Sequence, residues 1–512
     1  MRTFVLNSFL LFLIVFLVQC NDEESIIDEM APEIILLSNI NDSTVWNNVS
    51  IILDFTDREK VDTVEIFVNG TLLSKLTSPP YEFNWDTRTV EDGLHTIKIN
   101  ASNQAGQSSS KEFNVNVLNT LLTIKSNNFF GQIDNYKMYA FLSDQSGKTI
   151  AINELVADET IIFRPDGYES KDFTLGLAFI DSSIGFVNTY ANVSRGTVYE
   201  LPGNYGIKKS SITYESTPST LSYYLFSDGQ TTIASEYFED VPQEGNLSFD
   251  VNPSPLAYLL VKSGGMYKYS IIENIESDKD YIVDCNTMIT PTHKELTFPF
   301  EISGVEIIGI KEKTQISTFF ASSQKSTTVD IYYPESYFDN YLTIYNTPEV
   351  NGQRDSYCFK NSTPTAGDVT PNTFQIEVVN NSIDNFQYAM SGNGDWVRFY
   401  WGGENSGFMV AWSHNVPFGS SNYALPELPI AISNKHPKLI RSELTCYSAT
   451  MFDYDVPITN SGLEHQFTWG AEVFSARQVM FPNQSTGGRL KSTNLLRRYT
   501  DFNFMVDNLG QY

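Results

Sequence analysis

The residues best suited to bind a ligand lie in one aromatic-rich stretch, DWVRFYWGGENSGFMVAWSHNV, at residues 395–416. Its alternation predicts two strands that turn at Gly402-Gly403, with successive side chains on opposite faces. One face must pack on a core. The other would present aromatic rings beside an arginine, and such surfaces stack on sugar C–H faces while the guanidinium donates hydrogen bonds. The candidate glycan-binding residues are Trp396, Arg398, Tyr400, Trp401 and Trp412.

The same stretch has a second interpretation, in which both faces of the strands are buried and the rings fill a larger sandwich. A catalytic role has less support, because the sequence contains no nucleophile elbow, H-E-x-x-H or phosphate-binding loop. Paired carboxylates for glycoside hydrolysis remain open, since 61 acidic residues allow many pairs. The five histidines are widely separated, and we expect no metal or cofactor.

The four cysteines, Cys20, Cys285, Cys358 and Cys446, do not form a C-x-x-C motif or a zinc-site spacing. Cys358 and Cys446 both lie in the last region, so in an exported protein they could form a disulfide. Cys285 would then be a buried free thiol.

The first residues predict a leader. Arg2 precedes an apolar core from Phe9 to Val18, which is too short to span a membrane and is typical of a secretory signal. Leu17-Val18-Gln19-Cys20 resembles the lipobox of bacterial lipoproteins, in which the cysteine is acylated and begins the mature chain. The resemblance implies a signal peptide at 1–19 and lipidation of Cys20.

An acidic tether is expected at residues 20–30. Its first residues, Asn21-Asp22-Glu23-Glu24, resemble the acidic stretch that directs some Gram-negative lipoproteins to the outer face of the outer membrane. The resemblance implies a surface-exposed protein whose partner is outer-membrane lipid, and acyl chains on Cys20 would hold it stably. The alternative is a cleaved, soluble secreted protein in which Cys20 is lost or unmodified.

The formal charge of −28 argues against nucleic-acid binding, which requires clustered Lys and Arg to displace counterions from phosphates. Abundant Tyr and Phe without long helical stretches favours strands and turns. We therefore predict an all-β protein.

The first domain is expected at 31–118. Val64, Ile66 and Val68 alternate with Glu65 and Phe67, as in a half-buried strand, and Asn69-Gly70 is typical of a tight hairpin turn. Short strands with regular turn signals indicate an immunoglobulin-like sandwich. The segments VDTVEIFVNG, PPYEFNWDT, DGLHTIKI and ASNQAG resemble the repeated pattern of bacterial Ig-like domains. That resemblance implies a spacer or adhesive module rather than a catalyst.

The remainder shows a weak internal repeat: residues 136–155 resemble 221–238, and 173–201 resemble 256–285. Repeats of this length suit tandem small β-sandwiches. The predicted domains are 119–205 (β-sandwich repeat 1), 206–300 (β-sandwich repeat 2) and 301–512, an aromatic-rich C-terminal β domain of one or two units, with a fainter third copy from residue 316.

These features predict a lipid-anchored cell-surface protein whose Ig-like stalk presents β-sandwich modules for non-catalytic glycan binding. The plan resembles that of outer-membrane accessory lipoproteins for starch utilisation, a likeness of architecture that does not settle function. Two alternatives stay open. One is an adhesin or structural surface protein with a protein partner, and the other is a glycoside hydrolase or lyase with its catalytic residues in 301–512.

Overall fold

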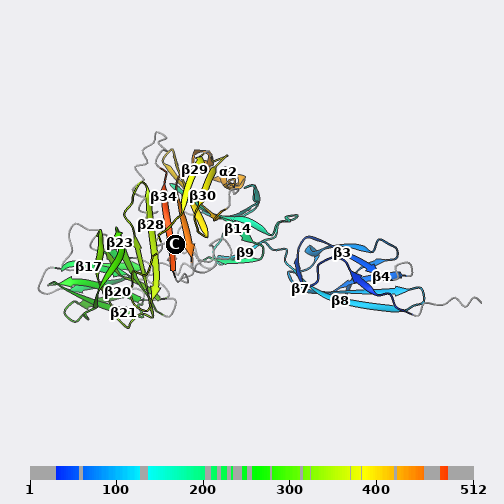
Figure 1. The fold of residues 1–512 in the computed structure, drawn as a ribbon, viewed down its shortest axis with the longest axis horizontal. Helices are drawn as coiled ribbons and strands as arrows, with labels where there is room; N and C mark the ends of the chain where they lie inside the picture. Colours follow the sequence, from blue (N-terminus) through cyan, green and yellow to red (C-terminus); the bar gives the residue numbers. More distant parts are fainter. Residues whose placement is uncertain are drawn as a thin grey trace, which may run out of the picture. The chain divides into compact units, whose positions relative to one another are not determined.

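The computed structural model shows an almost entirely β protein (Figure 1). The structure describes residues 30–56, 61–126, 137–201, 209–215, 221–227, 232–234, 245–250, 256–263, 265–276, 279–311, 315–322, 324–369, 371–381, 383–419, 424–454 and 473–481. The predicted signal peptide, Cys20 and nearly all of the acidic tether lie outside these residues.

The chain divides into two compact units. Unit 1 comprises Met1–Thr120 with Asp166–Glu169, and unit 2 comprises Leu121–Pro165 with Ser170–Tyr512. Within the described residues the helices are short: α2 (Ile430–Lys435), η2 (Thr87–Thr89) and η4 (Arg441–Glu443). None of the helices in the described residues is long and apolar enough to cross a membrane.

Unit 1 is a two-sheet sandwich, as its strand alternation predicts. One sheet has the order β1 (Ile34–Leu36), β3 (Asn48–Phe55), β6 (Glu82–Asp86). The other has the order β2 (Ser43–Val45), β8 (Ser108–Val117), β7 (Gly93–Asn103), β4 (Val61–Val68), β5 (Thr71–Leu76).

The core of unit 1 comes from the inward residues of both sheets. Ile51, Ile66 and Ile97 have no exposed surface, and Trp85 is 1% exposed. The turn between β4 and β5 is Asn69-Gly70, with φ of 48° and 79°. Both values are positive, as a tight hairpin turn of this kind requires, and the predicted turn is confirmed.

Unit 2 contains one strand arrangement four times. In each repeat a four-stranded sheet consists of two strand pairs, and the first strands of the two pairs are adjacent. The sheet orders are β11-β10-β13-β14, β18-β17-β20-β21, β25-β24-β27-β28 and β32-β31-β33-β34. We number these repeats 1 to 4 in chain order.

Repeats 1 and 2 each have a second, three-stranded sheet, with the orders β12-β9-β15 and β19-β16-β22. In both sheets the last strand is parallel to the central strand. The strands of repeat 1 are β9 (Leu122–Lys125), β10 (Lys137–Ser143), β11 (Thr149–Glu154), β12 (Thr160–Phe163), β13 (Asp172–Ile180), β14 (Ile184–Ser194) and β15 (Thr197–Glu200). Those of repeat 2 are β16 (Lys209–Glu215), β17 (Leu221–Ser227), β18 (Thr232–Ala234), β19 (Gly245–Asp250), β20 (Leu256–Ser263), β21 (Met266–Glu273) and β22 (Asp280–Asp284). The weak sequence repeat therefore has a structural counterpart.

Repeats 3 and 4 carry a two-stranded second sheet, β23-β26 and β29-β30. The strands of repeat 3 are β23 (Thr292–Ile302), β24 (Gly304–Lys311), β25 (Gln315–Ser322), β26 (Ser326–Tyr333), β27 (Asn340–Asn346) and β28 (Gln353–Asn361). Those of repeat 4 are β29 (Gln375–Asn380), β30 (Gln387–Ser391), β31 (Trp396–Asn405), β32 (Phe408–Pro417), β33 (Thr445–Tyr454) and β34 (Val473–Met480).

Three of these four-stranded sheets join edge to edge into one sheet of twelve strands. β14 of repeat 1 pairs in parallel with β32, and β34 pairs antiparallel with β28 of repeat 3. Repeat 4 thus lies between repeats 1 and 3 (Figure 1). The predicted all-β class, with an Ig-like sandwich followed by tandem β units, is confirmed. In addition, strands from the 119–205 and 301–512 segments share one sheet. The pairing satisfies backbone groups that exposed edge strands would leave open.

Repeat 2 shares a hydrophobic core with repeat 3 instead. Leu225, Tyr258 and Leu260 pack in one cluster with Ile307 and Phe319.

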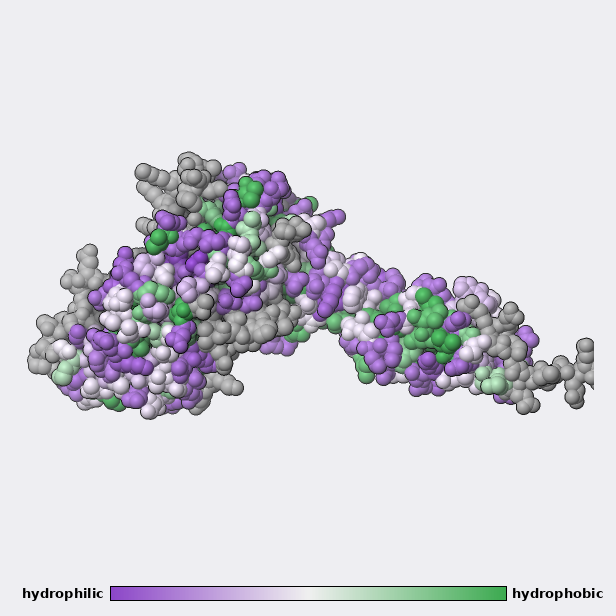
Figure 2. All heavy atoms as spheres, viewed as in Figure 1, coloured by the Kyte–Doolittle hydropathy of each residue, from purple (hydrophilic) through white to green (hydrophobic). Residues whose placement is uncertain are grey.

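The outer surface is mostly hydrophilic on the face shown in Figure 2, with apolar residues gathered in small patches.

Because β32 pairs with one edge of β14 and β34 with one edge of β28, removal of repeat 4 should leave that edge of each strand unpaired. We expect a fragment of residues 30–361 to lose amide protection in β14 and β28 by hydrogen–deuterium exchange, relative to the full chain. Protection in β20, which lies between β17 and β21, serves as the internal control. Equal protection of β14 in both proteins would contradict the role assigned to this pairing.

Candidate functional site

The predicted sugar-binding residues of β31 and β32 are mostly buried, which corrects the prediction of an exposed platform. Trp396 and Arg398 are each 8% exposed, and Trp401 and Trp412 are each 1% exposed. Tyr400 is half-buried. Rings that lack exposed faces cannot stack on a sugar, so the alternative interpretation of these strands as two-sided and buried is the one that the structure supports.

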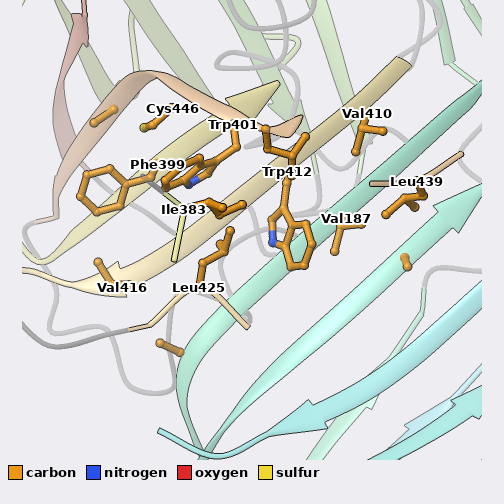
Figure 3. Packing of buried hydrophobic residues seen from close by; sticks show 14 of the residues in the cluster. Val187, Ile383, Phe399, Trp401, Val410, Trp412, Val416, Leu425, Leu439 and Cys446 are labelled. Carbon is orange, nitrogen blue, oxygen red and sulfur yellow. The ribbon is translucent and has the colours of Figure 1, made fainter. Parts of the chain in front are cut away.

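Trp401 and Trp412 belong to the largest core of unit 2. They are directly opposite each other on β31 and β32, and both join a cluster with Phe399, Val187 and Cys446 (Figure 3). Val187 comes from β14, so this core spans the junction between repeats 1 and 4. The aromatic residues therefore stabilise the contact between repeats.

A buried polar cluster sits at the same junction, centred on the hydroxyl of Thr189. The indole Nε1 of Trp412 donates to Thr189 Oγ1 at 3.0 Å, and His414 Nδ1 lies 2.8 Å from that oxygen. Burial lowers the pKa of His414 to about 3, so its imidazole is neutral at physiological pH. Asn415 Nδ2 donates to the backbone oxygen of Thr189 at 3.0 Å.

Arg398 extends this cluster instead of facing a ligand. Its Nε donates to Asn415 Oδ1 at 2.7 Å, and its guanidinium carbon lies 5.3 Å from the ring centroid of Phe452. Each polar group therefore helps to hold β32 between β14 and β31. Of the residues singled out from sequence, Arg398, Trp401 and Trp412 belong to this structural joint. Trp396 packs with Phe452 and Ala476 instead, and the ring of Tyr400 lies near that of Tyr447.

The proposed disulfide between Cys358 and Cys446 is absent, and both cysteines are buried free thiols. They lie on β28 and β33, which flank β34 on opposite sides. Two strand spacings alone amount to about 10 Å, and the register displaces the two cysteines further along β34, because Cys358 is opposite Phe474 whereas Cys446 precedes Ser448, the partner of Met480. A disulfide requires Cα atoms within about 7 Å. Cys285 is also free and buried, as predicted.

A different group of aromatic residues does reach the surface. Tyr267 of β21 stacks on Tyr332 of β26, with ring centroids 3.9 Å apart and planes inclined by 25°. His293 of β23 also stacks with Tyr332, with ring centroids 5.0 Å apart and planes inclined by 28°. We call Tyr267, His293 and Tyr332 the aromatic strip. Both tyrosines are half-buried, and His293 is exposed.

Charged groups surround the aromatic strip. Lys262 Nζ lies 4.8 Å from the ring centroid of Tyr267. At the other end, His293 Nε2 lies 2.7 Å from Asp330 Oδ1, and Glu295 is directly opposite Asp330 on the neighbouring strand. Burial and the charge of Asp330 raise the pKa of Tyr332, so its hydroxyl remains a hydrogen-bond donor.

Sequence reasoning missed the aromatic strip because its members are far apart in the chain. In VDIYY the alternation does place Tyr332 on the face opposite Ile331. No local pattern indicates that Tyr267 from repeat 2 lies against it. Among the described residues, no cluster of three His, Cys, Asp or Glu side chains could hold a metal ion.

Comparison with known proteins agrees with the architecture of unit 1. Residues 32–99 match the family described as the bacterial Ig domain. The Ig-like domain predicted at 31–118 is confirmed over these residues. No curated protein matches the chain.

Solved structures resemble parts of the chain at low identity. An endo-β-1,4-mannanase from Thermotoga petrophila is 13% identical, with 18% of this chain and 20% of that chain covered and a TM-score of 0.15. The fibronectin(III)-like modules of Clostridium thermocellum CbhA are 21% identical, with 17% and 96% covered and a TM-score of 0.15. Bacteroides ovatus SGBP-B in complex with a mixed-linkage heptasaccharide is 13% identical, with 59% and 91% covered and a TM-score of 0.16. The chain therefore spans about a fifth of the mannanase.

Replacement of Trp412 tests its role in the core. We expect Trp412→Ala to destabilise unit 2 by about 3–5 kcal/mol, because it leaves a large cavity and removes the hydrogen bond to Thr189. Denaturant unfolding monitored by circular dichroism measures the change. Thr328→Ala, at an exposed position of β26, is the matched control. Equal midpoints for the two variants would contradict the structural role.

The cysteines provide a second test. Burial raises the pKa of the thiols of Cys285, Cys358 and Cys446, so they should react slowly with Ellman's reagent in the native protein. In guanidinium chloride without reductant, a protein that starts at residue 21 should release three equivalents of thionitrobenzoate from the reagent, one for each free cysteine. Fewer equivalents would indicate that a disulfide does form.

Proposed function

We propose that this protein is a non-catalytic glycan-binding lipoprotein of the outer cell surface, anchored through acylated Cys20. The apolar leader and the acidic residues after Cys20 support the location. The bacterial Ig domain at 32–99 would act as a stalk, and the repeats of unit 2 would present the binding surface.

The aromatic strip is the observation that carries the proposal. A sugar offers apolar C–H faces and hydroxyl groups, which aromatic rings and charged or amide side chains bind respectively. The outer face of His293, the rims of the two tyrosines and the carboxylates of Asp330 and Glu295 supply both kinds of contact on one surface. The aromatic strip is ordered before binding because its rings stack on one another. Little side-chain entropy is therefore lost when a ligand binds.

A substitution at Tyr332 tests the proposal. Soluble protein of residues 21–512 should be retarded in affinity gels that contain a polysaccharide it binds, and Tyr332→Ala should weaken binding at least tenfold, which is about 1.4 kcal/mol. Tyr332→Phe keeps the stacking and removes only the hydroxyl, so it should weaken binding less.

Thr328→Ala lies on the same strand beyond the strip and should bind as the parent does. If Tyr332→Ala binds every polysaccharide as tightly as the parent does, the aromatic strip is not part of the binding surface. Release of shortened sugars from the gel polysaccharide would instead favour the glycoside hydrolase alternative.

A further inference from the structure

The outer face of the five-stranded sheet in unit 1 contains a groove of about 430 Å³. It is lined by residues of β4, β5, β7 and β8: Thr63, Glu65, Lys75, Asn100, Ala101, Ser102, Ser108, Ser109 and Ser110. The groove lies entirely within the Ig-like unit. Both sheets of this unit consist of its own strands, and they enclose one core between them.

Strand register brings the polar lining residues into two rows. Glu65 is opposite Lys75 on one side and Asn100 on the other, and Asn100 is opposite Ser110. In the second row Ser102 lies between Thr63 and Ser108. Cross-strand partners on one face have Cβ atoms about 5 Å apart, so polar groups from neighbouring strands can contact one ligand at the same time.

The hollow exists because small side chains are flanked by larger ones. Lys98 and Glu112 form the next cross-strand pair beyond Asn100 and Ser110, and their charged ends are 3.1 Å apart. A register shift between Val61 and Thr63 adds local twist at the other end. The floor is rigid, since Val64, Ile66 and Ile99 beneath it have no exposed surface.

The groove has unused hydrogen-bonding capacity. Within the described residues, the side chains of Asn100, Ser102, Ser108 and Ser110 make no hydrogen bond to the protein. Glu65 accepts from Lys75 at 3.2 Å, so the two formal charges at the groove offset each other. Hydroxyl and amide groups in a site without net charge suit a neutral, polyhydroxylated ligand better than an anion or a cation.

We propose that this groove binds neutral saccharides, so that the Ig-like unit takes part in recognition as well as serving as a spacer. Asn100 would donate to and accept from vicinal hydroxyls, Glu65 would accept a hydroxyl proton, and the serines would complete the contacts. The groove does not depend on the aromatic strip, which belongs to unit 2.

The test uses residues 30–120, which contain the groove and the whole core of unit 1 but lack the aromatic strip. Affinity gels containing laminarin, barley β-glucan, yeast mannan, xylan or starch supply the probes. We expect at least one polysaccharide to retard this fragment, and the double variant Asn100→Ala, Ser110→Ala to weaken that binding at least fivefold. Ser108→Trp should have a similar effect because it fills the groove from an exposed position.

Asn116→Ala is the matched control, since it is exposed on β8 outside the groove and should leave binding unchanged. Thermal unfolding of each variant checks that the fold is retained. The inference is overturned if no polysaccharide of the panel retards the fragment, or if both groove variants bind as the parent does. Tyr332→Ala in residues 21–512 tests the strip separately, so failure of one site is distinguishable from failure of the other.

Discussion

Parallel pairing of β14 with β32 is the contact on which the arrangement of unit 2 depends. It joins a strand of repeat 1 to a strand of repeat 4, which lies more than two hundred residues further along the chain. Hydrogen bonds to Thr189 from Trp412 and Asn415 are buried there, where an unpaired polar group would be costly. The contact therefore requires specific partners in addition to hydrophobic burial.

This constraint explains why the densest aromatic segment of the chain is not a binding surface. β31 and β32 are interior strands of a twelve-stranded sheet, and side chains on both of their faces are largely covered. Trp401 and Trp412 fill the core, while Arg398 and Asn415 bond to each other on the opposite face. The two surfaces proposed for ligand contact, the aromatic strip and the groove of unit 1, lie on other strands.

The two surfaces differ in their physical character. The strip relies on stacked rings supplied by repeats 2 and 3, with carboxylates at one end. The groove relies on small hydroxyl and amide side chains in register on one sheet, with its charges paired. Two weak sites on one protein raise its overall affinity for a polymer that reaches both.

Local features were predictable from sequence. The all-β class, the Asn69-Gly70 turn, the alternation of β4 and the buried state of Cys285 all follow from short-range patterns, and the structure confirms each one. The faint likeness of 136–155 to 221–238 was enough to indicate a repeat. Which face of a strand is covered could not be obtained this way, because alternation separates two faces without saying what packs on each.

The sequence by itself therefore determined the strands, the turns, the Ig-like domain and the repetition of one β unit, since these depend on neighbouring residues. Only the tertiary structure decided that Trp401 and Trp412 join repeats, that Cys358 and Cys446 are too far apart to bond, and that Tyr267 lies against Tyr332. The physical reason is that edge-to-edge strand pairing and cross-repeat stacking join segments remote in the chain. Such contacts leave no period or motif in the sequence between them.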